Sequence, residues 1–210
     1  MVEVKIGAQT LDLPYTLRVY GVTETMFDEM VDEDTRAELL DGVMMVHSPA
    51  TVQHDHVSGF LRALMSCYAD EKHLGLVLGP DALVHLATCR KLAPDVFFVR
   101  QERVPTPLPK EFEGTPDVVV EVLSPSNRSD DLSDKRRAYH DAGVHEIWFV
   151  DTEKRQVIID YRQAQDYVEE VVREDTISST ALTGFWIRAA WLWAEPLPNR
   201  MACLRTILDQ

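Results

Sequence analysis

The chain has 210 residues, of which 45% are hydrophobic, and this length suffices to bury a sizeable core. Its 21 Lys and Arg residues against 35 Asp and Glu residues give a net charge of -14, which argues against strong nonspecific binding of DNA. The sequence has no uncharged apolar stretch of about eighteen residues and no cationic head before an apolar run at its N-terminus, so we expect neither membrane spanning nor secretion.

The cysteines indicate a reducing environment, and the chain shows no division into separate domains. Cys67, Cys89 and Cys203 are far apart, odd in number and without metal-ligand spacing, so they indicate neither a disulfide framework nor a zinc site. This pattern fits a cytoplasmic protein. Because there is no internal repeat and no linker, we expect a single domain over residues 1–210.

Helices and a hairpin are predicted in the first third of the chain. Thr23 is a suitable N-cap for a short helix, which the acidic run at 32–34 ends. Apolar residues recur at helical spacing over 52–71 and predict a long amphipathic helix. Between these helices, Asp41-Gly42 separates two apolar-rich runs and predicts a hairpin turn, which places Glu38 on a strand just before it.

The rest of the chain is predicted to contain mainly strands. They are expected at 75–86 (two short strands broken at Gly79-Pro80), 93–99, 116–123, 145–151, 155–161 and 167–172. Loops are expected at 88–92 and at 101–116, where prolines oppose regular structure. Further helices are expected at 131–142 and 199–208.

The strand at 116–123 carries Glu121 inside a run of β-branched residues that is typical of a strand buried on both faces. Alternation places Glu121 on one face with Asp117, Val119 and Leu123, while valines fill the other face. A buried, unpaired carboxylate is costly, so we expect Glu121 to be held by a cation, a metal ion or a hydrogen-bond network. A structural salt bridge is the alternative interpretation.

The helix after this strand carries a lysine toward the same site. Ser129 or Asp130 would cap the helix and Gly143 would end it. One helical stripe should pack on the sheet and holds Leu132, Lys135, Tyr139 and Ala142. We therefore expect Lys135 to face the sheet, and the alternative is an ordinary exposed pair with Asp131.

Asp95, Glu121 and Lys135 together are the groups that metal-assisted phosphodiester hydrolysis needs. Carboxylate oxygens hold Mg²⁺ or Mn²⁺, the metal polarises the phosphoryl oxygen, and an ammonium group stabilises the developing charge. The spacing of acids on strands is by itself a common pattern and identifies no activity.

The chain also resembles a known family in a set of motifs that follow one another in the family's order. These motifs are Glu38-Leu39-Leu40-Asp41-Gly42, Ser48-Pro49, His54, Pro94-Asp95-Val96, Pro116 to Ser126, Asp131-Leu132, Lys135, Tyr139, Gly143-Val144 and Trp148 to Asp151. They are similar to those of the Uma-two (Uma2) family, bacterial restriction endonucleases of the PD-(D/E)xK nuclease superfamily. The resemblance covers about residues 20–175 and leaves 176–210 as a C-terminal extension.

The resemblance implies an α/β (α+β) fold in which helices flank a mixed central β-sheet, as in restriction endonucleases. It implies Asp95 and Glu121 as metal ligands and Glu38 as an additional catalytic acid. The superfamily's lysine usually stands two residues after the second acid, where this chain has Leu123. In similar families a lysine of the following helix reaches the same point, and Lys135 would do so here.

Other residues receive weaker assignments. His54 matches a histidine near the start of the family's long helix, and we expect His54 and Ser124 to line the site. Apart from His54 and His56, the histidines are interpreted as structural or surface residues: His47, His73, His85, His140 and His145. Phe185, Trp186, Trp191 and Trp193 are interpreted as core or oligomer contacts, and the latter would fit a homodimer.

The first hypothesis for function is an Mg²⁺-dependent or Mn²⁺-dependent endonuclease that acts on nucleic acid, with DNA as the expected substrate. The alternative is a catalytically inactive nuclease fold that serves as a binding or regulatory module, which the net charge of -14 and Leu123 favour. A third hypothesis, a metal-dependent hydrolase of a small phosphorylated substrate, ranks last because the chain lacks a glycine-rich phosphate loop.

Overall fold

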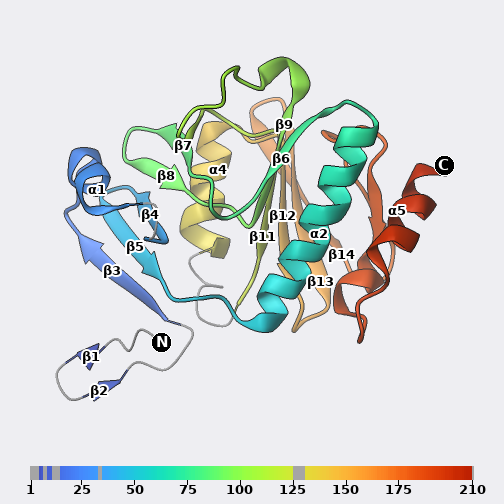
Figure 1. The fold of residues 1–210 in the computed structure, drawn as a ribbon, viewed down its shortest axis with the longest axis horizontal. Coiled ribbons are helices and arrows are strands. Elements are labelled where there is room, and N and C mark those ends of the chain that lie inside the picture. Colours follow the sequence, from blue (N-terminus) through green and yellow to red (C-terminus); the bar gives the residue numbers. More distant parts are fainter. Residues whose placement is uncertain (1–4, 7–8, 11–14, 33–34, 125–130, 210) are drawn as a thin grey trace.

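Two six-stranded mixed sheets form the frame of the chain in its described residues (Figure 1). The structure is a computed structural model, and it describes residues 5–6, 9–10, 15–32, 35–124 and 131–209. The expected mixed α/β class is confirmed, whereas the second large sheet was not anticipated. No helix in the described ranges has the length and apolar character needed to cross a membrane.

The first sheet contains the strand that carries Glu121. In spatial order its strands are β14 (Asp166–Val172), β13 (Gln156–Gln163), β12 (Glu146–Asp151), β11 (Val118–Val122), β9 (Val96–Arg100) and β6 (Gly75–Leu78). β11 runs parallel to β12 and antiparallel to β9. Because β11 is a central strand with partners on both sides, its backbone groups are paired and its side chains are buried against both faces.

The second sheet contains the predicted hairpin. Its strands in spatial order are β10 (Phe112–Glu113), β7 (Val84–Ala87), β8 (Arg90–Leu92), β4 (Ala37–Leu40), β5 (Val43–His47) and β3 (Thr16–Tyr20). Asp41 and Gly42 have φ values of 50° and 85°, which are the left-handed conformations that a two-residue turn of this kind requires. The hairpin prediction is therefore confirmed, and Glu38 lies on β4.

The remaining elements are helices, short helical turns and two small hairpins. They are β1 (Lys5–Ile6), β2 (Gln9–Thr10), α1 (Glu24–Met30), α2 (Val52–Glu71), η1 (Gln101–Arg103), η2 (Asp131–Lys135), α4 (Arg136–Ala142), β15 (Thr176–Ser178), β16 (Trp186–Arg188), η3 (Ala189–Trp193) and α5 (Arg200–Leu208). β1 pairs with β2, and β15 pairs with β16.

The helix predictions hold where the structure describes them. The hydroxyl of Thr23 accepts from the Met26 N–H at the start of α1, and α2 has the predicted bounds. Gly143, with φ 77°, ends α4 as expected. The proposed caps Ser129 and Asp130 lie outside the described residues.

Two loop predictions were wrong in part. Residues 90–92 form β8, because a turn at Cys89, with φ 59°, folds this segment back onto β7. The proline-rich segment at 101–116 contains η1 and β10, because Phe112 and Glu113 lie between the prolines and can pair with β7. Short strands of two or three residues carry too little periodicity to be predicted from sequence.

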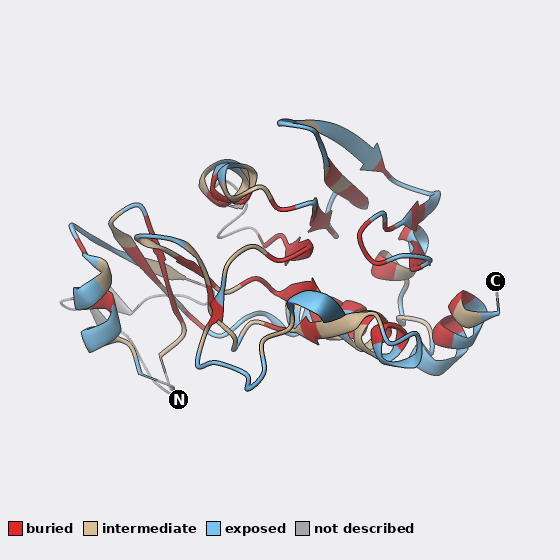
Figure 2. Ribbon diagram, turned by 90° about the horizontal axis from the view of Figure 1, so that it is seen from above, coloured by how far each residue is buried: buried red, intermediate tan, exposed pale blue. Residues whose placement is uncertain are grey.

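Helices cover both faces of the first sheet (Figures 1 and 2). Val118, Val120 and Val122 pack with α2 and the C-terminal segment in one core cluster, while Val119 and Leu123 pack with α4 in another. Alternation along β11 was therefore predicted correctly. The buried residues, red in Figure 2, follow the sheet between the helices. Trp186 is buried in the core cluster that contains α2, which confirms a packing role for this side chain.

Candidate active site

The residues predicted to form or line a site converge on one small cavity. Its volume is about 50 Å³, and it is lined, among others, by Glu38, His54, Asp95, Glu121, Ser124 and Lys135. Since a water molecule needs roughly 10–15 Å³ of such volume, the cavity can hold an ion with a few oxygen groups. These residues come from β4, α2, β11, η2 and the segments beside β9 and β11, so the fold assembles the site from both sheets.

Asp95 and Glu121 lie side by side at the ends of neighbouring strands. Val96 pairs with Val120 in the antiparallel ladder, so the next step along both strands brings Asp95 beside Glu121. Oδ2 of Asp95 accepts from the N–H of Val122 at 2.8 Å, which fixes the carboxylate at this position. Both carboxylates are buried, with exposed fractions of 5% for Asp95 and 3% for Glu121.

Lys135 joins the two sheets through its ammonium group. It is the last residue of η2 and faces the sheet, as the helical stripe predicts. Its Nζ lies 2.9 Å from Oε1 of Glu38 and 3.4 Å from Oε1 of Glu121. The buried cation therefore contacts a carboxylate from each sheet, and burial without such partners would be costly.

Glu38 accepts from three different donors. Oε1 accepts from the N–H of Ala93 at 2.8 Å and from Lys135, while Oε2 lies 2.7 Å from Nε2 of His47. Burial would raise the pKa of Glu38, but the charge of Lys135 and the hydrogen bonds from His47 and Ala93 together hold that pKa well below its ordinary value. Glu38 is therefore a stable anion that compensates the charge of Lys135.

Two further side chains contact Asp95 from the mouth of the cavity. Nε2 of His54 lies 3.0 Å from Oδ2 of Asp95, and a guanidinium nitrogen of Arg36 lies 3.7 Å from Oδ1. His54 belongs to the first turn of α2, whose N-cap Thr51 also lines the cavity. The first turn of α2 thus faces the carboxylates. Arg36 is about one-third exposed at the rim.

Sequence reasoning missed some members of this cluster. His47 was assigned to structure or surface, yet it pairs with Glu38. The hairpin register could have shown this, because Glu38 pairs with Met45 and His47 lies two residues further on the same face. Tyr139 was placed on the correct helical stripe without a role, and its hydroxyl donates to Oε1 of Glu121 at 2.6 Å.

The donor set fits a hard divalent cation. Asp95 and Glu121 present buried carboxylates on one wall of the cavity, and Glu38 adds a third. Mg²⁺ and Mn²⁺ prefer such oxygen ligands and keep several bound waters. Lys135 and Arg36 offset only part of the negative charge, so the cavity can hold a metal ion at Asp95 and Glu121.

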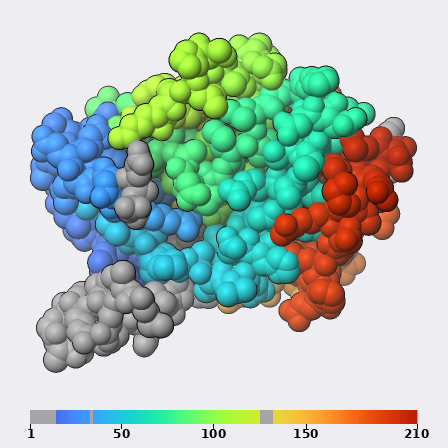
Figure 3. Space-filling view, in the orientation of Figure 1, coloured from blue at the N-terminus to red at the C-terminus, as the bar shows by residue number. Residues whose placement is uncertain are grey.

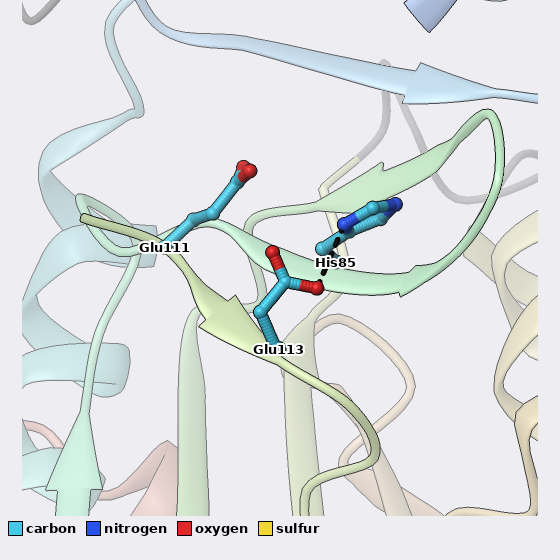
Figure 4. A group of neighbouring side chains, drawn as sticks. All are labelled: His85, Glu111 and Glu113. Atoms are coloured by element: carbon cyan, nitrogen blue, oxygen red, sulfur yellow. Dashed lines mark ion pairs between the residues drawn. The ribbon is translucent and has the colours of Figure 1, made fainter. Parts of the chain in front are cut away.

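A second group of side chains that could hold a metal ion is drawn in Figure 4, and none of its members lines this cavity. One ligand atom from each of His85, Glu111 and Glu113 lies within 4.8 Å of the others. The ammonium of Lys91, however, already lies 2.9 Å from Glu111 and 2.7 Å from Asp28. Because a protein cation already balances these acids, the arrangement has the features of a structural ion-pair network.

Comparisons with known proteins agree with the fold. The family model Uma2, described as "Putative restriction endonuclease", matches residues 25–190. A crystal structure from Anabaena variabilis, titled a "putative nuclease belonging to DUF820", superposes with a TM-score of 0.73 at 15% identity. The match covers 82% of this chain and 97% of the other, and at this identity it supports the fold alone. No curated protein sequence matches the chain.

Proposed function

The chain belongs to the Uma2 family, described as putative restriction endonucleases, and we propose that it hydrolyses phosphodiester bonds of DNA with the help of Mg²⁺ or Mn²⁺. The observation that supports this proposal is the convergence of Glu38, Asp95, Glu121 and Lys135 on one cavity. Residues far apart in the sequence and in different sheets meet there, and the chemical groups are those that phosphodiester hydrolysis needs.

Asp95 and Glu121 would hold the metal ion. Their carboxylates are neighbours on antiparallel strands, and backbone and side-chain donors fix their orientation. A bound divalent ion would supply Lewis-acid polarisation of the phosphoryl oxygen and a lower pKa for an attacking water. His54 and Tyr139 would act as positioning residues, because His54 contacts the carboxylate of Asp95 and Tyr139 that of Glu121.

Lys135 takes the place of the superfamily's lysine at position 123. Leu123 is buried in the core against α4, so this position contributes to packing. Lys135 instead reaches Glu121 from η2, the turn before α4. The carboxylate of Glu38 lies beside the Lys135 ammonium, which would stabilise negative charge on the scissile phosphate.

A second candidate is a nuclease fold that binds nucleic acid or regulates a partner without cleavage. One observation favours it besides the net charge of -14. Hydrogen bonds and ion pairs already link His47 to Glu38, Glu38 to Lys135, and Lys135 and Tyr139 to Glu121. Such a network is stable without turnover.

Cleavage assays decide between these functions. Purified protein would be incubated with double-stranded and single-stranded DNA in Mg²⁺ or Mn²⁺, beside Glu121→Gln prepared in the same way. Cleavage that requires the metal and is lost in Glu121→Gln supports the nuclease. Absence of cleavage by the wild type, together with measurable metal binding, supports the binding or regulatory module.

We also propose that the chain acts in the cytoplasm and forms a homodimer, as the sequence predicts. Light scattering after gel filtration tests the dimer directly. A monomeric mass at micromolar concentration would contradict it.

A further inference from the structure

A shallow groove follows the exposed side of α2 and has a volume of about 890 Å³. α2 supplies most of its floor, the end of β6 supplies one side, and Arg200 at the start of α5 supplies the other. The exposed side of α2 belongs to the face seen in Figure 3, where the C-terminal segment, in red, lies beside it. Among the groove's lining residues the only acid is Asp55.

Two arginines of this groove, Arg62 and Arg200, are exposed. Within the described part of the chain, neither guanidinium makes a hydrogen bond or ion pair. Arg90 and Arg136, by contrast, each contact two carboxylates. In a chain with 35 acids, two neighbouring arginines without a carboxylate are available for an external anion.

A glycine gives one of these arginines its room. A Cβ added to Gly79 would collide with the guanidinium of Arg62, whereas one added to Gly59 would lie at an ordinary contact distance of 4.0 Å from Nη2 of Arg200. The absence of a side chain at Gly79 therefore lets Arg62 lie against the backbone there. Both cations line the same groove.

The same helix connects this groove to the candidate active site. Thr51 and His54 in the first turn of α2 line the site cavity, and Arg62 follows His54 by two helical turns. At 1.5 Å per residue, this separation corresponds to about 12 Å along the helix. One strand of B-DNA has a phosphate every 3.4 Å of helix axis, so about three or four phosphates span this length.

We propose that Arg62 and Arg200 bind the phosphate backbone of the DNA whose scissile phosphate lies at the Asp95 and Glu121 cavity. This inference rests on the proposed function and adds the surface by which an acidic protein holds an acidic polymer. Binding of DNA by these two arginines would be independent of base sequence, because they would contact phosphates alone.

Another cavity beside the site is less suitable for phosphates. It has a volume of about 640 Å³ and shares Arg36 and Ala93 with the site cavity. Four carboxylates line it, from Asp28, Asp32, Asp81 and Glu111, together with the cations Arg36 and Lys110. Even with Lys91 beside Asp28 and Glu111, the acids outnumber the cations, whereas the lining of the groove along α2 has two arginines and one acid, so the groove suits a phosphate backbone better.

The test is the salt dependence of DNA binding. Fluorescence anisotropy of a labelled DNA duplex, measured without divalent metal so that no cleavage occurs, gives the slope of log K against log salt concentration. Each phosphate contact contributes about 0.9 to this slope. We expect Arg62→Gln and Arg200→Gln each to reduce the slope by about 0.9, and the double variant by about 1.8.

Arg205→Gln is the matched control. Arg205 is exposed, lies on α5 like Arg200 and does not line the groove. Unchanged slopes in both groove variants, an equal reduction in Arg205→Gln, or no DNA binding by the wild type would each overturn the inference. Melting temperatures equal to that of the wild type ensure that the variants are folded. The cleavage assay with Glu121→Gln judges the proposed function separately.

Discussion

Glu121 and Glu146 are buried carboxylates on adjacent parallel strands, yet their surroundings differ in kind. Glu121 on β11 is 3% exposed and Glu146 on β12 is fully buried. Glu146 pairs in register with Val118, so it points into the core against α2, whereas Glu121 points toward α4. Depth of burial alone therefore does not separate a functional carboxylate from a structural one.

Glu146 is surrounded by neutral donors. Oε1 accepts from Nε1 of Trp148 at 2.6 Å. Oε2 accepts from the hydroxyls of Ser179 and Thr180 and from the N–H groups of Thr180 and Ala181, at 2.8 to 3.0 Å. These donors tie the segment before β16 to the sheet. Glu146 thus acts as a structural anchor for the C-terminal part of the chain.

Glu121 is surrounded by different partners. Its Oε1 is contacted by the phenol of Tyr139 and the ammonium of Lys135, and the carboxylate borders a cavity. A buried carboxylate that borders a cavity has room to bind a further cation, while one whose oxygens are saturated by side-chain and backbone donors has none. The cavity and the cation therefore distinguish Glu121 from Glu146, and they are the features that indicate function.

The largest expected effect is the loss of cleavage in Glu121→Gln. Removing the carboxylate that we propose as a metal ligand should lower the cleavage rate by about 1,000-fold, equal to about 4 kcal/mol of activation free energy. The free energy of unfolding should change by less than about 1 kcal/mol, because the substitution keeps the shape and removes a charge from an acidic cluster. Single-turnover cleavage and urea denaturation measure the two quantities. A variant that unfolds easily would contradict the functional assignment of Glu121.

Glu146→Ala should show the opposite pattern. The variant leaves several buried donors without an acceptor, and we expect the free energy of unfolding to fall by about 3 kcal/mol or more. Cleavage per folded molecule should stay near that of the wild type, since Glu146 lies on the other face of the sheet. Urea denaturation followed by tryptophan fluorescence provides the measurement. Unchanged stability would show that Glu146 is not an anchor.

Tyr139→Phe tests how much one hydrogen bond to Glu121 contributes to metal affinity. The variant removes one hydrogen bond to the carboxylate without changing the packing of the ring. A lost contact to a ligand residue should weaken metal affinity by about 10-fold, within the usual range for such positions. Calorimetric titration with Mn²⁺ would measure it, with Tyr167→Phe as the control, because the hydroxyl of Tyr167 donates to the Val144 carbonyl instead. Equal effects in both variants would contradict a positioning role for Tyr139.

The smallest effect is the contribution of Glu38 to stability at low pH. The folded-state pKa of Glu38 is lowered, so its ionised form stabilises the fold above the ordinary pKa of 4.5, and this contribution is lost as pH falls toward the lowered value. The difference in free energy of unfolding between wild type and Glu38→Gln should be constant above about pH 5.5 and should shrink below 4.5. Urea titrations over this range test it. A constant difference at all pH values would contradict the assignment.

Local patterns predicted much of this architecture. The helical spacing of apolar residues over 52–71 predicted the bounds of α2, and Asp41-Gly42 predicted the hairpin. The alternation of side chains predicted the two faces of β11. Each of these signals extends over several residues or depends on a turn with a strict backbone requirement. β8 and β10 were missed because strands of two or three residues form only when a neighbour supplies their partners.

The sequence predicted residues that line one cavity, but not the contacts between them. Helical spacing placed Lys135 on the face toward the sheet, but its pairing with Glu38 depends on how the second sheet meets the first. The contact of Arg36 with Asp95 depends on the same arrangement, which no local pattern encodes, whereas the hairpin register does place His47 beside Glu38. Glu146, in turn, gave no signal, because all its donors except Trp148 lie more than thirty residues away in the sequence.

Mn²⁺ binding measured by electron paramagnetic resonance tests directly whether a divalent ion binds at Asp95 and Glu121, as we propose. The wild type should bind Mn²⁺, Glu121→Gln should lose this binding, and Glu111→Gln should keep it, because Lys91 already balances the network around His85. This readout does not depend on any substrate. Binding that survives in Glu121→Gln and disappears in Glu111→Gln would place the metal at the His85 cluster and contradict the account.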